Sequence, residues 1–85
     1  MNHGHRLDQL PSGTRGVVRR IDSADAALHR LMAMGLCLGR SVEIVRQGSP
    51  LILRLLGAHI GVSSRVARQI VIEPTPDESL PSDAR

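Results

Sequence analysis

The side chains that can ligate a metal ion are few and scattered along this 85-residue chain. Neither C-x-x-C nor H-x-x-x-H, the spacings that set two ligands side by side, occurs in it. His3 and His5 form an H-x-H near the N-terminus, without a rigid third ligand beside them. His59 could join Glu43 or Cys37, or residues of a neighbouring molecule, although such a histidine is more often an exposed polar residue. The sequence therefore predicts no required cofactor, and any Fe2+ or Zn2+ is expected to be held weakly or adventitiously.

Nucleophilic catalysis has no better support. The serines, Cys37 and the histidines of the central body show no nucleophile–base spacing, and a chain of this size has little room for a pocket that excludes water. Cys37 lies between Leu36 and Leu38, which predicts a partly buried, inert thiol. We expect no enzyme activity.

The composition predicts an aliphatic core and argues against nucleic-acid binding. The hydrophobic fraction is 41%, yet Phe, Tyr and Trp are all absent, so base-stacking platforms are missing. The net charge of +3 comes from 11 arginines against eight carboxylates, and residues 1–72 carry ten arginines with four carboxylates. The densest basic cluster is Arg19-Arg20, and no recognition helix is apparent. We expect no nucleic-acid partner.

The chain shows no feature of a secreted or membrane-spanning protein. Its start is polar, and its longest apolar runs, such as Leu51–Leu53, are far short of the roughly 20 residues that span a bilayer. A single cysteine cannot form an internal disulfide, which favours a reducing compartment. The sequence predicts a cytoplasmic protein.

Polar ends flank one small domain. Residues 1–6 are predicted to be a flexible N-terminus, residues 7–73 the folded domain, and residues 74–85 a disordered acidic tail. Ser23 is a natural N-cap for a helix over residues 24–34, and Gly35 suits the position just after its end. A second N-cap, Ser63, precedes one helical turn that ends near Arg68. Short strands are expected at Val17–Ile21, Ser41–Arg46, Leu51–Leu56, His59–Val62 and Ile70–Glu73.

Five short strands around an aliphatic interior predict a mostly β fold, a small five-stranded SH3-like barrel. Closure of the sheet would remove exposed strand edges. The OB-fold is the competing five-stranded architecture, but it usually has longer strands and displays aromatic side chains.

Residues 30–44, RLMAMGLCLGRSVEI, resemble the RL-x-x-MGL-x-x-G-x-x-x-x-I signature of the FeoA family. The similarity extends through L-x-x-L-x-x-G-x-x-G at residues 7–16, the turn at 48–51, Gly57 and the closing segment 67–72, and so covers about residues 7–73. Two departures stand out. Leu38 replaces a common proline, and Ser63-Ser64 replaces a more basic pair.

The resemblance implies a non-catalytic cytosolic accessory protein of bacterial ferrous iron uptake. Such proteins act beside FeoB, the membrane ferrous iron permease with a cytosolic GTPase domain, and the chain would be recruited to the inner face of the membrane through that partner. Gly35 and Gly39 would let the chain leave the helix sharply and hold apolar side chains around one corner. The predicted partner-binding residues are Met32, Met34, Leu36, Leu38, Arg30 and Arg40, with Gly57 as a further motif glycine.

Other interpretations stay open. The apolar side chains could simply seal the core, and the arginines, Arg19 and Arg20 among them, could be solvated surface charges. A metal-responsive regulatory module is one alternative function, because SH3-like domains form the C-terminus of diphtheria-toxin-repressor-type transcription factors. A small iron-binding chaperone is another. Weak self-association is also left open.

Overall fold

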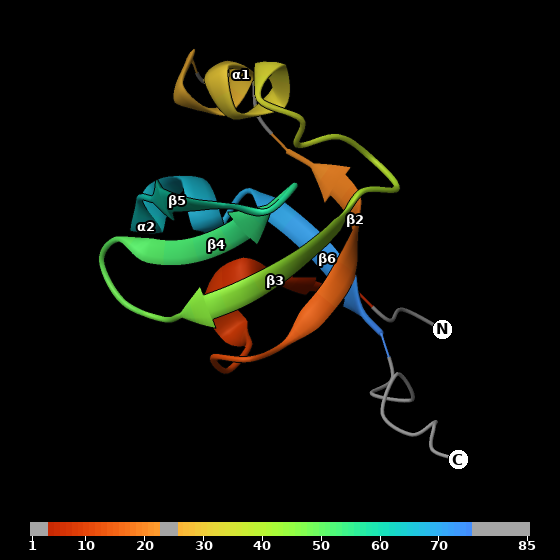
Figure 1. Ribbon diagram of the computed structural model, residues 1–85, viewed down its shortest axis with the longest axis vertical. Helices are drawn as coiled ribbons and strands as arrows, with labels where there is room; N and C mark the ends of the chain where they lie inside the picture. Colours follow the sequence, from red (N-terminus) through yellow and green to blue (C-terminus); the bar gives the residue numbers. More distant parts are fainter. Residues whose placement is uncertain (1–3, 23–25, 76–85) are drawn as a thin grey trace.

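The computed structural model describes residues 4–22 and 26–75. They form six strands, two short helices and one 3-10 turn, joined by loops. Helix α1 lies at one end of the molecule, beyond the sheet, and the tip of the β4–β5 hairpin lies below it (Figure 1). In chain order the elements are β1 His5–Arg6, η1 Leu7–Gln9, β2 Arg15–Ile21, α1 Ala26–Ala33, β3 Ser41–Arg46, β4 Leu51–Leu55, β5 Ala58–Val62, α2 Ser64–Ala67 and β6 Ile70–Pro74.

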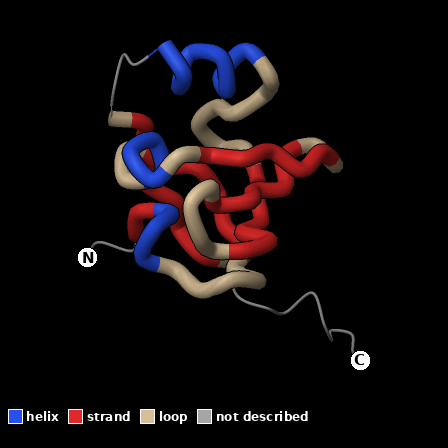
Figure 2. The backbone as a smooth tube through the Cα atoms, turned by 90° about the vertical axis from the view of Figure 1, so that its left-hand side faces the viewer, coloured by secondary structure: helices blue, strands red, loops and turns tan. Residues whose placement is uncertain are grey.

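The strands form one antiparallel sheet in the order β1-β6-β2-β3-β4-β5. The strands curl around the interior (Figure 2), which confirms the predicted mostly β class. The prediction of a closed five-stranded barrel matches only loosely. The sheet has a sixth strand, and β1 and β5 remain as its two edges.

The N-terminal boundary differs from the expected one. His5 and Arg6, expected in a flexible N-terminus, pair with Ile72 and Val71 of β6, whereas His3 lies outside the described residues. Gln47 fixes the turn that follows, because its Nε2 donates to the Leu7 carbonyl at 2.7 Å and also to the Leu10 carbonyl. A two-residue strand is too short to show a periodicity, so it could not be predicted from the sequence.

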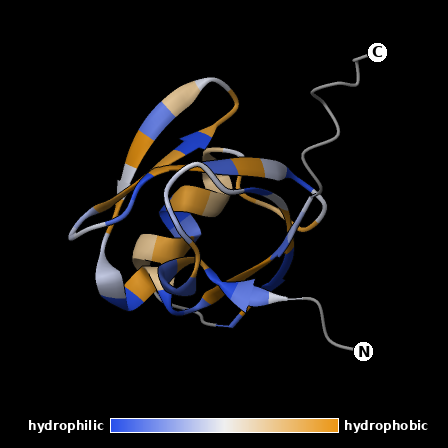
Figure 3. Cartoon of the chain, turned by 90° about the horizontal axis from the view of Figure 1, so that it is seen from below, coloured by the Kyte–Doolittle hydropathy of each residue, from blue (hydrophilic) through white to orange (hydrophobic). Residues whose placement is uncertain are grey.

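The core is aliphatic, as the absence of aromatic residues predicts. Side chains alternate between interior and surface along the strands, which the alternating hydropathy bands of Figure 3 reflect. In β4, for example, Arg54 points to solvent between two buried leucines. The buried set comprises Leu7, Val18, Leu28, Leu31, Leu36, Val42, Ile44, Leu51, Leu53, Leu55, Val62, Val66, Ala67, Ile70, Val71 and Ile72.

The two helices match the predicted positions with shorter bounds. Ser63 caps α2 as predicted, since its Oγ accepts from the Val66 amide at 3.2 Å. The predicted cap of α1, Ser23, lies outside the described residues. No described helix is long and apolar enough to cross a membrane.

Gly16 of β2 leaves no room for a side chain against β6, and this generates a stability prediction. A Cβ at Gly16 would lie 2.7 Å from the Glu73 carbonyl oxygen, so Gly16→Ala must push the two strands apart. We expect it to lower the free energy of unfolding by about 1–3 kcal/mol. Denaturant unfolding followed by far-UV circular dichroism measures the change.

Gly61→Ala is the matched control for this prediction. A Cβ at Gly61 meets only the Pro50 ring at 3.6 Å, an ordinary contact, so its effect should stay within about 0.5 kcal/mol. Equal stability of the two variants would contradict the close-approach argument.

Candidate functional site

The end of α1 is a Schellman motif centred on Gly35. The Leu36 amide donates to the Leu31 carbonyl at 3.0 Å and the Gly35 amide to the Met32 carbonyl at 3.1 Å, the two bonds that define the motif. Gly35 has a φ of 118°, a conformation that L side chains rarely adopt. Gly35 therefore occupies the position predicted from the sequence, and its neighbours Met34 and Leu36 must leave the helix in different directions.

Leu36 belongs to the core rather than to an exposed surface. It is fully buried, and Leu31, its partner in the motif, is 8% exposed. This corrects the expectation that Leu36 contacts a partner, because the Schellman geometry packs the residue after the glycine back against the helix. The large hydrophobic residues that remain exposed are Met32 (43%), Met34 (49%), Leu38 (63%) and Leu56 (62%).

Leu38 is exposed because it occupies the outer corner of a tight turn. The Arg40 amide donates to the Cys37 carbonyl at 3.0 Å, and Gly39 has a φ of 87°, as residue i+2 of a type II turn requires. Hydrogen bonds of 2.8 and 2.9 Å between the segment 39–40 and Val18 fix this turn to β2. Proline is favoured at the first corner of such a turn, so the backbone at Leu38 suits the proline that is common at this position of the signature.

Leu56 is a site residue that sequence reasoning missed. It was expected to end a strand, but it forms with Gly57 the two-residue turn of the β4–β5 hairpin, with φ values of 52° and 83°. Positive φ at both positions is typical of a type I′ turn, where Asn-Gly is preferred and a leucine is strained. The Leu56 side chain covers Gly35, since a Cβ at Gly35 would lie 2.5 Å from Leu56 Cδ1. The only local indication of this turn in the sequence is the glycine that follows Leu56 between two predicted strands.

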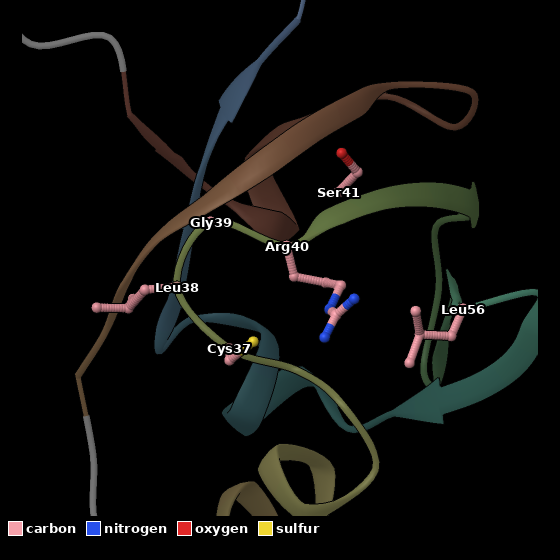
Figure 4. A pocket seen from close by; sticks show the side chains of 6 residues that line it. All are labelled: Cys37, Leu38, Gly39, Arg40, Ser41 and Leu56. Atoms are coloured by element: carbon pink, nitrogen blue, oxygen red, sulfur yellow. The ribbon is translucent and has the colours of Figure 1, made fainter.

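The turn and the hairpin tip border an open depression of about 510 Å³, lined by Cys37, Leu38, Gly39, Arg40, Ser41 and Leu56 (Figure 4). The Arg40 guanidinium extends between Cys37 and Leu56, whereas Leu38 points the other way. Arg40 is half-buried, and its Nε donates to the Gly35 carbonyl at 3.0 Å. Cys37 is exposed, contrary to the expected partly buried thiol, because it starts the turn at the surface.

Of the four arginines singled out in the sequence, two are paired with carboxylates of the described residues and two are not. Arg19 binds Glu73 at 2.8 Å and Arg20 binds Asp22 at 3.0 Å, so both are already engaged. Arg30 is exposed on α1 and Arg40 lines the depression. These two therefore are the candidate cations near the exposed apolar residues.

The candidate metal ligands do not come together. Glu43 of β3 binds Arg54 of β4 at 3.4 Å, and Arg54 in turn lies opposite His59 of β5. Arg54 therefore stands between Glu43 and His59, while His5 lies on β1 and Cys37 in the turn. The described ranges hold no group of three His, Cys, Asp or Glu side chains that could bind a metal ion.

We define the apolar corner as Met34, Cys37, Leu38 and Leu56. The last three line the depression together with Arg40, Met34 directly precedes Gly35, and Met32 is exposed on α1. Methionine and leucine side chains adapt to varied apolar partners. The depression is open to solvent, and the corner carries no nucleophile–base pair. Exposed apolar side chains beside an open depression suit protein docking.

Comparison with known proteins identifies the relatives of this chain. The sequence profile of the FeoA domain matches residues 5–74. A Methanocaldococcus jannaschii protein provisionally named Fe(2+) transport protein A is 31% identical over 62 residues, which are 72% of this chain and 76% of the relative. Both comparisons extend well beyond the signature segment and take in most of the sheet.

Solved structures share the fold. Chlorobium tepidum FeoA has a TM-score of 0.78 at 25% identity, covering 95% of this chain and 85% of that chain. Stenotrophomonas maltophilia FeoA, solved with zinc and described as a prokaryotic SH3 domain protein, has a TM-score of 0.69 at 27% identity, covering 79% and 86%. The SH3-like assignment is thereby confirmed.

A protein described as a manganese-dependent transcriptional repressor has the same fold at lower identity. It gives a TM-score of 0.78 at 19% identity, covering 88% of this chain and 44% of that chain. A likeness at that identity extends to the fold alone, so it adds nothing in favour of a regulatory function.

The strained position of Leu56 leads to a second prediction. Leu56→Asn and Leu38→Asn remove two leucines of nearly equal exposure, 62% and 63%, but only the first relieves a positive φ. We expect Leu56→Asn to be about 1 kcal/mol more stable than Leu38→Asn. Chemical denaturation of both variants measures the difference, and a less stable Leu56→Asn would show that the contact with Gly35 outweighs the backbone strain.

Proposed function

The chain belongs to the FeoA family, and we propose that it acts as a non-catalytic accessory protein of ferrous iron transport that docks its apolar corner on the cytosolic, GTPase-bearing region of a FeoB permease. Family membership supports a role in ferrous iron transport. We propose in addition that the permease is the partner and that the apolar corner is the contact surface.

The observation that carries the docking proposal is the open depression bordered by two exposed leucines from separate segments of the chain. Leu38 of the type II turn and Leu56 of the hairpin tip both line it with Arg40, and the exposed Met34 directly precedes Gly35, which the Leu56 side chain covers. Burying such side chains against a partner contributes about 1.5–3 kcal/mol each when burial is complete. A patch of this kind on a small domain is typical of an interaction surface.

A non-catalytic role agrees with the chemistry of the corner. Its polar side chains are the Cys37 thiol and the Arg40 guanidinium, and the guanidinium only donates hydrogen bonds. General acid–base or nucleophilic catalysis would need a base within hydrogen-bonding reach of the thiol. The corner therefore offers recognition, and the hydrolysis of nucleotide belongs to the partner.

We place the protein in the cytoplasm, at the inner face of the membrane, through this partner. Among the described residues no helix could span a bilayer. Docking on the cytosolic region of a permease would bring the protein to the membrane.

Metal binding is proposed to be weak and separate from docking. With Arg54 between Glu43 and His59, no described cluster supplies three ligands. A Zn2+ titration of the isotope-labelled protein is expected to shift histidine ring signals progressively, without saturation at one equivalent, and His59→Ala should change only its own signal. Saturation at equimolar Zn2+ that His59→Ala abolishes would contradict this and favour a chaperone.

The docking surface can be tested by charge insertion. Leu38→Glu and Met34→Glu place a carboxylate where the partner is expected to bury an apolar side chain, so each should weaken binding by at least about 10-fold. Binding is measured by an NMR titration of the 15N-labelled protein with the purified cytosolic region of FeoB from the same organism, with and without guanine nucleotide.

His5→Glu is the matched control, because it adds the same charge on β1, at the opposite edge in strand order from the hairpin tip. It should bind like the original protein. Amide shifts confined to residues away from 34–40 and 56, with full affinity in Leu38→Glu, would move the surface elsewhere on the domain.

A further inference from the structure

We infer that the segment received by the apolar corner carries a carboxylate, an Asp or Glu side chain flanked by apolar residues, and that Arg40 is the residue that binds it. This inference rests on the proposed docking function and specifies the chemistry of the partner. Its starting point is the distribution of ion pairs over the described residues.

Every described carboxylate already has an arginine. The four pairs involve arginines from β1, β2 and β4, and each joins neighbours in the turn or in the sheet. They are Arg6 with Asp8, Arg19 with Glu73, Arg20 with Asp22 and Arg54 with Glu43. The domain body thus has no spare acidic side chain within residues 4–22 and 26–75, although it has more arginines.

Arg40 differs from the remaining arginines in its surroundings. Arg15, Arg30, Arg46 and Arg68 also lack an ion pair with a described carboxylate, but all four are exposed and can be hydrated freely. Arg40 is half-buried in a depression whose walls include Leu56 and Cys37. A cation with reduced hydration and no counter-charge gains more from a carboxylate than an exposed one does.

The guanidinium is also held in a fixed position. Its Nε donates to the Gly35 carbonyl at 3.0 Å, which leaves the two terminal NH2 groups for a ligand. These groups extend into the space between Cys37 and Leu56 (Figure 4). Two parallel donors on a planar group match the two oxygens of a carboxylate. Because the Gly35 carbonyl already orients the side chain, less rotamer freedom is lost on binding.

The geometry favours a protein partner over a nucleotide or over the described domain of a second copy. The described part of a second copy has no unpaired carboxylate to offer. A nucleotide phosphate is usually held by several cations or by a series of backbone amides, whereas the depression has a single guanidinium among apolar side chains. A partner segment with one acidic residue between apolar ones satisfies both the cation and the leucines.

The experiment uses the full chain and the cytosolic region of FeoB from the same organism as the probe. Arg40→Gln removes the charge but keeps an amide that can reach the Gly35 carbonyl, and Arg46→Gln is the matched control, an exposed unpaired arginine at the end of β3. Arg40→Gln should weaken binding by about 10- to 100-fold, as expected for a charge-assisted hydrogen bond, and Arg46→Gln by less than about twofold. Arg40→Lys, which keeps the charge without the fork, should fall between them.

A direct readout comes from the guanidinium itself. In the 15N-labelled protein the Arg40 Nε–H signal should shift on binding, and its Nη signals should sharpen as a carboxylate restricts their rotation. Thermal unfolding by circular dichroism checks that all three variants fold.

The outcomes separate the two proposals. Docking that Leu38→Glu abolishes but Arg40→Gln leaves intact would overturn the carboxylate inference and keep the docking function. Absence of any binding would overturn both. An Arg40 Nη response to guanine nucleotide alone, or one that rises with protein concentration without the partner, would assign the site to a phosphate or to self-association and would also overturn the inference.

Discussion

The left-handed backbone at Gly35 is the constraint on which the rest of the site depends. Because the chain turns there, Leu36 is directed into the core against Leu31, while Met34 stays at the surface. The Gly35 carbonyl, freed from the helix, becomes the acceptor that holds Arg40, and the missing side chain leaves the space that Leu56 fills. One residue thus couples the helix end, the type II turn and the hairpin tip. Any larger residue at this position would meet Leu56 as well as adopt an unfavourable φ.

The ion pairs of the domain leave Arg40 as the available cation in the depression. Four cross-strand or local ion pairs use up the described carboxylates, and all four are solvent-exposed enough to contribute little to stability. Their effect is instead to neutralise arginines on the strands, so that the body presents fewer free cations than its composition indicates. Near the apolar corner, Arg40 is held by a backbone carbonyl rather than by a carboxylate. Its positive charge therefore remains available within the depression.

The sequence predicts the elements that have periodicity or a cap, and it fails where position depends on distant partners. The alternation in β3, the Ser63 cap and the glycine after α1 are local signals, and the structure has each where it was expected. Leu36 looks the same as Leu38 in sequence, and only the Schellman geometry separates a core residue from an exposed one. Leu56 was missed because the sequence does not show at which residue strand β4 ends and the type I′ turn begins. The pairing register with β5 sets that boundary. β1 forms only by pairing with β6, which is its neighbour in the sheet but lies at the other end of the domain's sequence.

Two of the exposed hydrophobic residues occupy backbone positions where another residue type would make the folded protein more stable. This argues that their side chains serve an interaction. Leu56 has a φ of 52°, where asparagine or glycine avoids a cost of about 1 kcal/mol. Leu38 stands at the corner of a type II turn, where proline would restrict the unfolded chain and add about 0.4–1 kcal/mol. Neither leucine recovers this through burial in the core, because both are more than 60% exposed. Leu56 and Leu38 thus each make this small domain, with its all-aliphatic core, less stable than another residue would. Apolar contacts that form only when a partner covers the apolar corner best explain both choices.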